Sequence, residues 1–317
     1  MITQNSSAPL IAVVGATGIQ GGSVIKTLTA SSKPYRVRGF TRDATKPVSQ
    51  DLIAKGVEMV TVSLVVDNVK EVFKAFEGAN MAFLVTNFLE HMDAERETAE
   101  AKMMIDAAKV GGVERIVWSG LPHCTKLSAG KITHVGHYDS KAAASGYGRQ
   151  SGIPFVDVQA GFYASNFFNP WIAPVKRADG TYAIPLPLSP TVPLPVIDMA
   201  RDYGLYVLRA LEAPVFPDGS EVHTGLDITM EEVAIQLSQV TGKRIIIEQI
   251  TLDQYGKKMA DSGAPVHVVV DMLDAWKWFE EFGYYGGEAT SSVEGLAKHP
   301  LSFREFAKAE DWSKVFM

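Results

Sequence analysis

The chain has 317 residues, of which 46% are hydrophobic and 21% charged, so its composition indicates a globular protein and excludes a disordered one. Its formal net charge of −6 argues against direct nucleic-acid binding, because contacts with phosphates require clustered lysines and arginines. A single cysteine, Cys124, excludes an internal disulfide, and the apolar stretches are shorter than the roughly 18 residues of a membrane-spanning helix. The N-terminus is unlike a signal peptide, so we expect a protein of the cytoplasm, or alternatively of the nucleus, without a membrane partner.

An apolar segment at residues 10–14 leads directly into the glycine-rich sequence GATGIQGG at residues 15–22. The apolar run is typical of a buried parallel strand, and the pattern that follows predicts an amphipathic helix over residues 22–30. Glycines in the turn between them permit a sharp bend, close approach to a pyrophosphate and tight packing of helix on strand. The spacing G-x-x-G-x-x-G is one residue longer than the G-x-G-x-x-G form. We therefore predict a dinucleotide site formed by Gly15, Thr17, Gly18, Ile19, Gln20 and Gly21.

The second expected strand, residues 35–41, ends in a cation instead of the carboxylate that usually binds the ribose of NAD. Arg42 can pair bidentately with a 2′-phosphate and stack on adenine, and Lys46 can assist it. These residues favour NADP(H). Asp43, one residue further on, keeps NAD as the alternative.

Strand-like and helix-like segments alternate through the first half of the chain. Further strands are expected at residues 58–62, 81–86, 115–118 and 154–159, and further helices at 49–55, 69–76, 94–110 and 138–150. This alternation predicts an α/β fold, a doubly wound parallel Rossmann sheet with its ligand at the carboxyl ends of the strands.

After residue 160 the pattern changes, because residues 170–195 contain seven prolines. Prolines exclude a long helix and favour extended loops or edge strands. Beyond them we expect a helix at 199–211 capped by Asp198, a capping box at 229–232, and a strand at 245–250. The predicted organisation is a Rossmann domain of residues 1–160, completed by parts of 190–225, and a smaller α+β C-terminal substrate or partner domain of residues 161–317.

Aromatic residues gather near the end of the chain, where Trp276, Trp278, Phe279 and Phe282 could line a pocket for a flat apolar substrate. Their spacing also suits an amphipathic helix packed into the core, and that interpretation is favoured. Phe162, Tyr163 and Phe168 lie nearer the expected cleft and are better candidates for a pocket wall.

Several segments together resemble the NmrA-like family, namely residues 15–22, 41–43, 85–87, 118–121, 137–141, 161–167 and 229–233. The resemblance covers nearly the whole chain. It implies a Rossmann domain with a smaller C-terminal domain, a preference for NADP(H), and cofactor contacts from Thr86, Asn87, Ser119, Lys141 and Phe162. Members include cofactor-sensing repressors of fungal nitrogen-metabolism transcription factors, and relatives reduce quinones or phenylpropanoids. One departure is the sequence Val62–Ser63–Leu64, where relatives often carry an aspartate that touches adenine.

The short-chain dehydrogenases, to which this family is related, place a tyrosine four residues before a lysine, so that the ammonium lowers the pKa of the phenol. Counting back from Lys141 gives His137, and the tyrosine stands at position 138. Three hypotheses remain open: His137 is the proton donor, Tyr138 is the donor from a rotated position, or the site is not catalytic. The non-catalytic site is favoured.

Three histidines and the lone cysteine lie close together in sequence, at positions 123, 124, 134 and 137. Their spacing matches no zinc pattern, so we predict no metal site. Cys124 is either a redox switch beside the nicotinamide or inert packing.

The first functional hypothesis is an NADP(H)-binding regulator that reports the redox state of the cofactor to a protein partner, such as a transcription factor. The alternative is an NADPH-dependent reductase of a small apolar carbonyl, quinone or enone, in which Lys141 acts with His137 or Tyr138.

Overall fold

The computed structural model describes residues 2–213 and 220–316. Within them a seven-stranded central sheet is formed by β1 (Leu10–Val13), β2 (Arg36–Thr41), β3 (Glu58–Thr61), β4 (Met81–Leu84), β5 (Arg115–Trp118), β6 (Phe155–Gln159) and β11 (Ser220–His223). The strand order is β11-β6-β5-β4-β1-β2-β3, and all neighbouring strands are parallel. The predicted doubly wound Rossmann sheet is confirmed, and the order reverses beside β1, where such sheets bind ligands.

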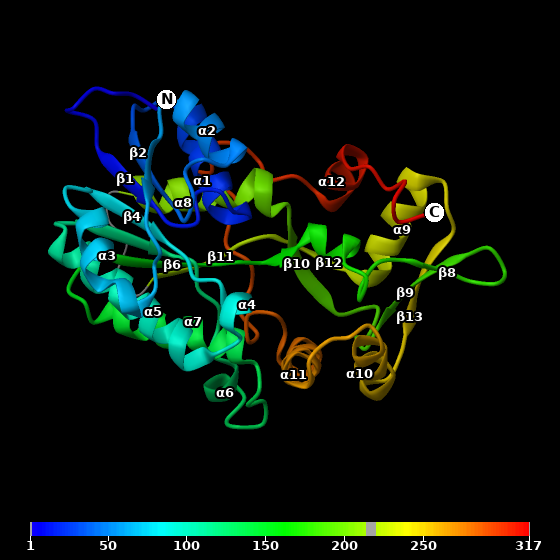
Figure 1. Cartoon of the computed structure of the whole chain (residues 1–317). Coiled ribbons are helices and arrows are strands. Elements are labelled where there is room, and N and C mark those ends of the chain that lie inside the picture. The colour runs from blue at the N-terminus through cyan, green and yellow to red at the C-terminus, as the bar shows by residue number, and fades with distance from the viewer. Residues whose placement is uncertain (1, 214–219, 317) are drawn as a thin grey trace.

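Helices cover both faces of this sheet (Figure 1). One face carries α1 (Ile19–Ala30), α2 (Pro47–Ala54) and α8 (Met199–Glu212), and the other carries α3 (Val69–Phe76), α5 (Ala94–Val110) and α7 (Gly136–Arg149). In β1, Ile11 and Val13 face the first layer while Ala12 faces the second. An uninterrupted apolar strand is therefore required, because successive side chains enter different cores.

The C-terminal region, residues 161–317, contributes two small sheets and a separate core on the right of Figure 1. The sheets have the orders β12-β10-β7 and β13-β9-β8, formed by β7 (Phe162–Tyr163), β8 (Val175–Lys176), β9 (Tyr182–Leu186), β10 (Pro193–Ile197), β12 (Leu226–Thr229) and β13 (Ile245–Gln249). The helices here are α9 (Met230–Thr241), α10 (Leu252–Asp261), α11 (Val266–Phe282) and α12 (Phe303–Ala309). Additional small sheets thus accompany the Rossmann sheet.

The prediction that the proline-rich segment forms loops or edge strands was wrong for β9 and β10, which lie in the middle of their sheets. The pairing explains why prolines are tolerated there. Pro185 pairs with β13, but β8 reaches only Ala183, and Pro195 pairs with β12, but β7 begins pairing at Val196. Each proline therefore stands just beyond the end of the third strand, where a missing N–H removes no ladder hydrogen bond.

Two helices begin with the caps that the sequence predicts. Asp198 caps α8, and Thr229 forms the capping box of α9, as expected. Helix α1 begins at Ile19, earlier than predicted, because Gly21 and Gly22 are accommodated in its first turns.

Trp276, Trp278 and Phe279 are buried in the C-terminal core, which supports the core interpretation of the aromatic cluster. Two short helices were missed: α4 (Phe88–His91) and α6 (Cys124–Leu127). Among the described residues, no helix is long and apolar enough to cross a membrane.

Helices α1 and α8 lie against each other at Gly204, whose N–H donates to Ser23 Oγ over 3.0 Å. A Cβ on Gly204 would lie 2.3 Å from the carbonyl oxygen of Ser23. We expect Gly204→Ala to destabilise the protein by about 1–3 kcal/mol, because the two helices must move apart. Gly146 lies inside α7 with open space around it, so Gly146→Ala should stabilise by about 0.5–1 kcal/mol. Urea unfolding of both variants checks this, and equal effects would contradict the packing argument.

Candidate functional site

The glycine-rich loop lies between β1 and α1, at the carboxyl end of the sheet. Gly15 has a φ of +65°, and a Cβ on Gly21 would lie 2.2 Å from the carbonyl oxygen of Gly15. Both positions therefore exclude larger residues. Gly18 is the N-cap of α1 without a side-chain cap, and the first turn of α1 has no acidic residue. The backbone N–H groups of this turn, which follows Thr17, are left for an anion such as a pyrophosphate.

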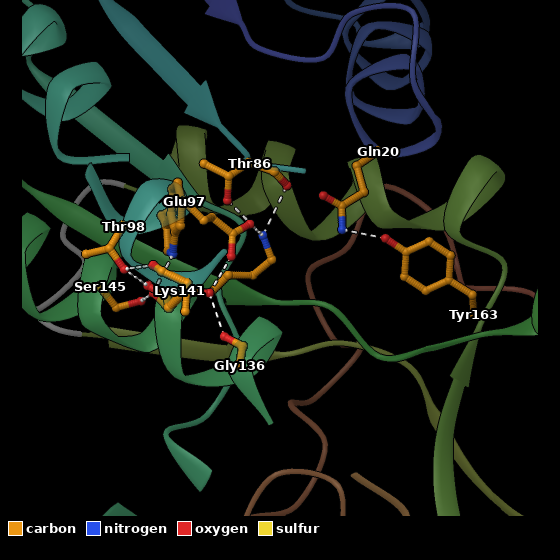
Figure 2. Close-up of polar contacts among 11 residues, drawn as sticks. Gln20, Thr86, Glu97, Thr98, Gly136, Lys141, Ser145 and Tyr163 are labelled. Atoms are coloured by element: carbon orange, nitrogen blue, oxygen red, sulfur yellow. Dashed lines mark hydrogen bonds and ion pairs between the residues drawn. The ribbon is translucent and has the colours of Figure 1, made fainter. Parts of the chain in front are cut away.

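The side chain of Gln20, in the first turn of α1, extends to the C-terminal region. Its Nε2 donates to the hydroxyl of Tyr163 over 2.8 Å (Figure 2). Its Oε1 is buried without a hydrogen-bond partner in the described structure. An unpaired buried acceptor is costly, so this atom fits a ligand that brings a donor, such as a hydroxyl or amide of a dinucleotide.

At the end of β2, Arg42 is exposed and its Nη1 lies 2.5 Å from Oε1 of Glu90 on α4. Asp43 is occupied within its own turn, because its Oδ1 accepts from the backbone N–H of Thr45 over 2.8 Å and from the Thr45 hydroxyl. These hydrogen bonds hold the pKa of Asp43 below its ordinary value. Of the two residues, the arginine is the one available to a ligand, together with the exposed Lys46 at the start of α2.

Lys141, on α7, is held in a buried polar cluster (Figure 2). Its Nζ donates to Oε1 of Glu97 over 2.7 Å, to Oγ1 of Thr86 over 2.8 Å and to the carbonyl oxygen of Thr86 over 3.0 Å. It also lies 5.9 Å from the centre of the Trp118 ring. An ammonium has three N–H groups, and all three have acceptors here. A ribose hydroxyl can reach Lys141 only by replacing one of them, most readily Thr86.

Glu97, whose side chain is only 2% exposed, was not predicted from the sequence. It lies on the buried face of α5 with Ala101, Met104 and Ala108, at helical spacing. An acidic residue on an otherwise apolar helix face is the signal that could have revealed it, because buried carboxylates require a cation or several donors.

The two candidate proton donors point away from Lys141. His137 Nδ1 lies 2.5 Å from Oδ1 of Asp271 on α11. Tyr138 is buried in the C-terminal core against Phe279, and burial, followed by the effect of Tyr284, raises its pKa well above the ordinary value. Neither side chain accepts a hydrogen bond from Lys141. The arrangement that lowers the pKa of a phenol in a dehydrogenase is therefore absent around Tyr138.

The other histidines near this site have carboxylate partners of their own. His123 Nδ1 lies 2.9 Å from Oδ1 of Asp139, and His134 Nδ1 lies 2.9 Å from Oδ2 of Asp274. The described residues contain no group of three or more potential ligands that could hold a metal. Cys124 is fully buried, and burial raises the pKa of its thiol, which disfavours a reactive thiolate.

Of the remaining predicted contacts, Ser119 and Phe162 are buried and Asn87 is exposed. Ser119 follows β5 and is buried, with its N–H donating to Leu84 over 2.9 Å. Phe162 is buried in the C-terminal core beside Phe167. Asn87 is the N-cap residue of α4, directly after Thr86. The structure thus brings Thr86 and Lys141 into contact, whereas Arg42 and Lys46 lie at the end of β2.

A buried acid lies under the loop that follows β5. Asp157 Oδ2 accepts from Ser145 Oγ over 2.6 Å, and a Cβ on Gly120 would lie 2.0 Å from Asp157 Oδ1. Burial raises the pKa of Asp157 to about 7, against the opposing effects of Ser145 and Arg149. The carboxyl therefore holds a proton at pH values where an exposed aspartate has lost it.

Comparison with known proteins places this geometry in a family. The model of the NmrA-like family matches residues 7–312. The chain belongs to the NmrA-like family. The NmrA-like family domain-containing oxidoreductase ptmS of Penicillium ochrochloron is 26% identical over 91% of this chain and 83% of its own length. The nitrogen metabolite repression protein nmrA of Emericella nidulans is 29% identical over 76% of this chain and 68% of its own length.

Several solved structures share the fold of this chain. NmrA, a negative transcriptional regulator crystallised with NAD, has 24% identity and a TM-score of 0.78 over 96% of this chain and 95% of its own. The triphenylmethane reductase of Citrobacter sp., crystallised with NADP(H), has 20% identity and a TM-score of 0.72 over 94% of this chain and 99% of its own. One fold therefore serves both a regulator and a reductase.

The raised pKa of Asp157 predicts a pH-dependent stability. Its pKa in the native state, about 7, exceeds its ordinary value of 3.8, so the native state is destabilised progressively as the pH rises between these values. Asparagine does not ionise, so Asp157→Asn should not lose stability in this way. The free energy of unfolding of the variant minus that of the wild type should therefore rise by about 2 kcal/mol between pH 5 and pH 8. Urea unfolding at both pH values measures it. Asp179→Asn, at an exposed residue with a lowered pKa, is the control and should show no such change. A difference that is constant with pH would contradict the buried protonated carboxyl.

Proposed function

We propose that this chain binds NADP(H) at the carboxyl end of the central sheet. The glycine loop would hold the pyrophosphate, and Arg42 with Lys46 the 2′-phosphate. Thr86, Asn87, Ser119, Lys141 and Phe162 would lie along the nicotinamide half. The support comes from the two glycines that exclude larger residues, the uncapped first turn of α1 and the unpaired Oε1 of Gln20. Relatives of the same fold crystallised with NAD or NADP(H) agree with it.

We further propose that the protein is a cofactor-responsive regulator acting through a protein partner in the cytoplasm or nucleus. The observation that carries this proposal is the state of Lys141, whose three N–H groups are all engaged by Glu97 and Thr86. With Tyr138 in the C-terminal core, the site has a cofactor cradle without the dehydrogenase proton relay. A regulator needs the residues that bind the cofactor but not the proton relay.

The contact between Gln20 and Tyr163 supplies a route by which cofactor binding would reach a partner surface. We infer that residues 1–160, completed by α8 and β11, form the nucleotide-binding unit and that the rest of 161–317 forms a second unit. A dinucleotide donor to Gln20 Oε1 would act at the boundary between these units. The oxidised and reduced forms would then differ in how they hold Tyr163.

The second candidate is an NADPH-dependent reductase, which the oxidoreductase names of relatives such as ptmS favour. Hydride transfer to a quinone or another delocalised acceptor does not require a phenol beside the lysine, because the product anion is stabilised by delocalisation and takes its proton from water. The same geometry is less suited to a simple carbonyl, whose alkoxide needs a proton donor in place.

Calorimetric titration of the purified protein with the four nicotinamide dinucleotides tests the regulator. NADPH and NADP⁺ should bind at least about tenfold more tightly than NADH and NAD⁺, because Arg42 gains charge-assisted hydrogen bonds. The reduced and oxidised phosphorylated forms should also differ in affinity. Equal affinity for NADPH and NADP⁺ would contradict redox sensing while leaving cofactor binding in place.

The role of Lys141 is tested by Lys141→Gln, whose amide can still donate to Glu97 and Thr86 but leaves the buried Glu97 carboxylate without its cation. We expect a loss of stability of about 3–5 kcal/mol and, in protein that circular dichroism shows to be folded, about tenfold weaker NADPH binding, because a charged donor near the ribose is lost. Lys102→Gln, at an exposed lysine on α5, is the matched control and should bind NADPH normally. Normal binding by Lys141→Gln would contradict the position assigned to this lysine.

The reductase is tested by NADPH oxidation with a panel of quinones and enones. The regulator predicts no turnover above the background rate. If turnover is found, Tyr138→Phe should retain it, since the phenol is buried away from Lys141. A loss of about 100-fold or more in Tyr138→Phe would instead identify the phenol as the proton donor.

A further inference from the structure

An ion pair joins two strand ends on either side of the glycine loop. Arg42 follows β2, Glu90 lies on α4 after β4, and their Nη1 and Oε1 atoms are 2.5 Å apart. The strand order places β1 between β4 and β2. The pair therefore spans the carboxyl end of β1, which is the position where a dinucleotide crosses the sheet in this type of fold.

Glu90 is presented by a short helix that is fixed on both sides. Phe88 of α4 is buried, with its ring 5.9 Å from that of His137. His91 Nε2 lies 3.3 Å from Oε1 of Glu100 on α5. The helix ends at Met92, which has a φ of 53°. The backbone that carries Glu90 is thus fixed by the packing of α4, whereas the side chain of Arg42 is 68% exposed.

The Nη1 group of Arg42 is engaged by the Glu90 carboxylate. A guanidinium binds a phosphate best through two N–H groups side by side, so the 2′-phosphate of NADP(H) would compete with Glu90 wherever that pair includes Nη1. A phosphate near Arg42 would also approach the Glu90 carboxylate, and the two negative charges would repel each other. NAD(H) carries a hydroxyl at this position, so it neither competes with Glu90 for Arg42 nor is repelled by the Glu90 carboxylate.

We propose that Glu90 is a specificity-determining residue that competes with the 2′-phosphate for Arg42 and so limits the preference of this chain for NADP(H) over NAD(H). The inference rests on the proposed NADP(H) function and on the position of Arg42 in it. Removing the charge of Glu90 replaces the ion pair by a weaker neutral hydrogen bond and removes the repulsion of the phosphate. The ratio of NADPH to NADH affinity then rises.

The test is calorimetric titration of Glu90→Gln with NADPH and with NADH at low ionic strength, where charges are least screened. NADPH affinity should rise about three- to tenfold, the size expected when an exposed competing charge is removed. NADH affinity should stay within about twofold, because the hydroxyl gains no ion pair. The matched control is Glu95→Gln, which removes the same charge from an exposed residue of α5 and should leave the ratio unchanged.

Arg42→Gln separates this inference from the proposed function. It should weaken NADPH binding far more than NADH binding, which loses only the stacking of the guanidinium on adenine, and adding Glu90→Gln to it should no longer raise the ratio. If Arg42→Gln behaves in this way but Glu90→Gln leaves the ratio unchanged, the competition is overturned and the cofactor site stands. If Arg42→Gln does not discriminate between the two nucleotides, Arg42 is not the phosphate ligand and the inference fails with it. Binding of neither nucleotide by the wild-type chain would overturn the proposed function itself.

Discussion

The buried ion pair between Lys141 and Glu97 determines how the candidate site is built. It ties α7 to α5 and, through Thr86, to the segment after β4, so that three elements meet at one ammonium. Two charges with side chains 12% and 2% exposed lose most of their hydration, which only close pairing and further hydrogen bonds can offset. The lysine is therefore a fixed part of the candidate site. A cofactor has to bind beside this cluster, and the cluster positions no proton donor toward a substrate.

Most of the fold was predictable from the sequence because six of the seven strands of the central sheet carry their own signal, whereas β11 was not predicted as a strand. The apolar run of β1 is continuous because Ile11 and Ala12 enter different cores, and the glycines after it mark the turn. The middle position of β9 and β10 was not predictable. Whether a proline interrupts a ladder depends on where the neighbouring strand ends, and for Pro185 that is decided by the short pairing of β8, which sequence periodicity does not reveal.

The candidate site was predictable only in part, because its decisive contacts join distant segments. Helical spacing left His137 and Tyr138 as equal alternatives beside Lys141, since residues three and four apart both border a lysine. Their actual directions are set by α11 and the C-terminal core, through Asp271 and Phe279. Glu97 carried a local signal, a charge on the buried face of an expected helix, but its partner lies on another helix.

Two sets of contacts join the candidate site to the C-terminal region, one at the start of α7 and one at the glycine loop. A bound cofactor would act on that region through them. Several contacts join the start of α7 to α11: His134 and His137 lie beside Asp274 and Asp271, and the N–H of Gly136 donates to Oδ2 of Asp271 over 2.7 Å. The glycine loop is fastened to the same region by one neutral hydrogen bond from Gln20, which also leaves an acceptor unpaired. A ligand shifts such a boundary most easily where the fewest contacts have to change. The Gln20 end would therefore move first, and the paired histidines would serve as the fixed side of that movement.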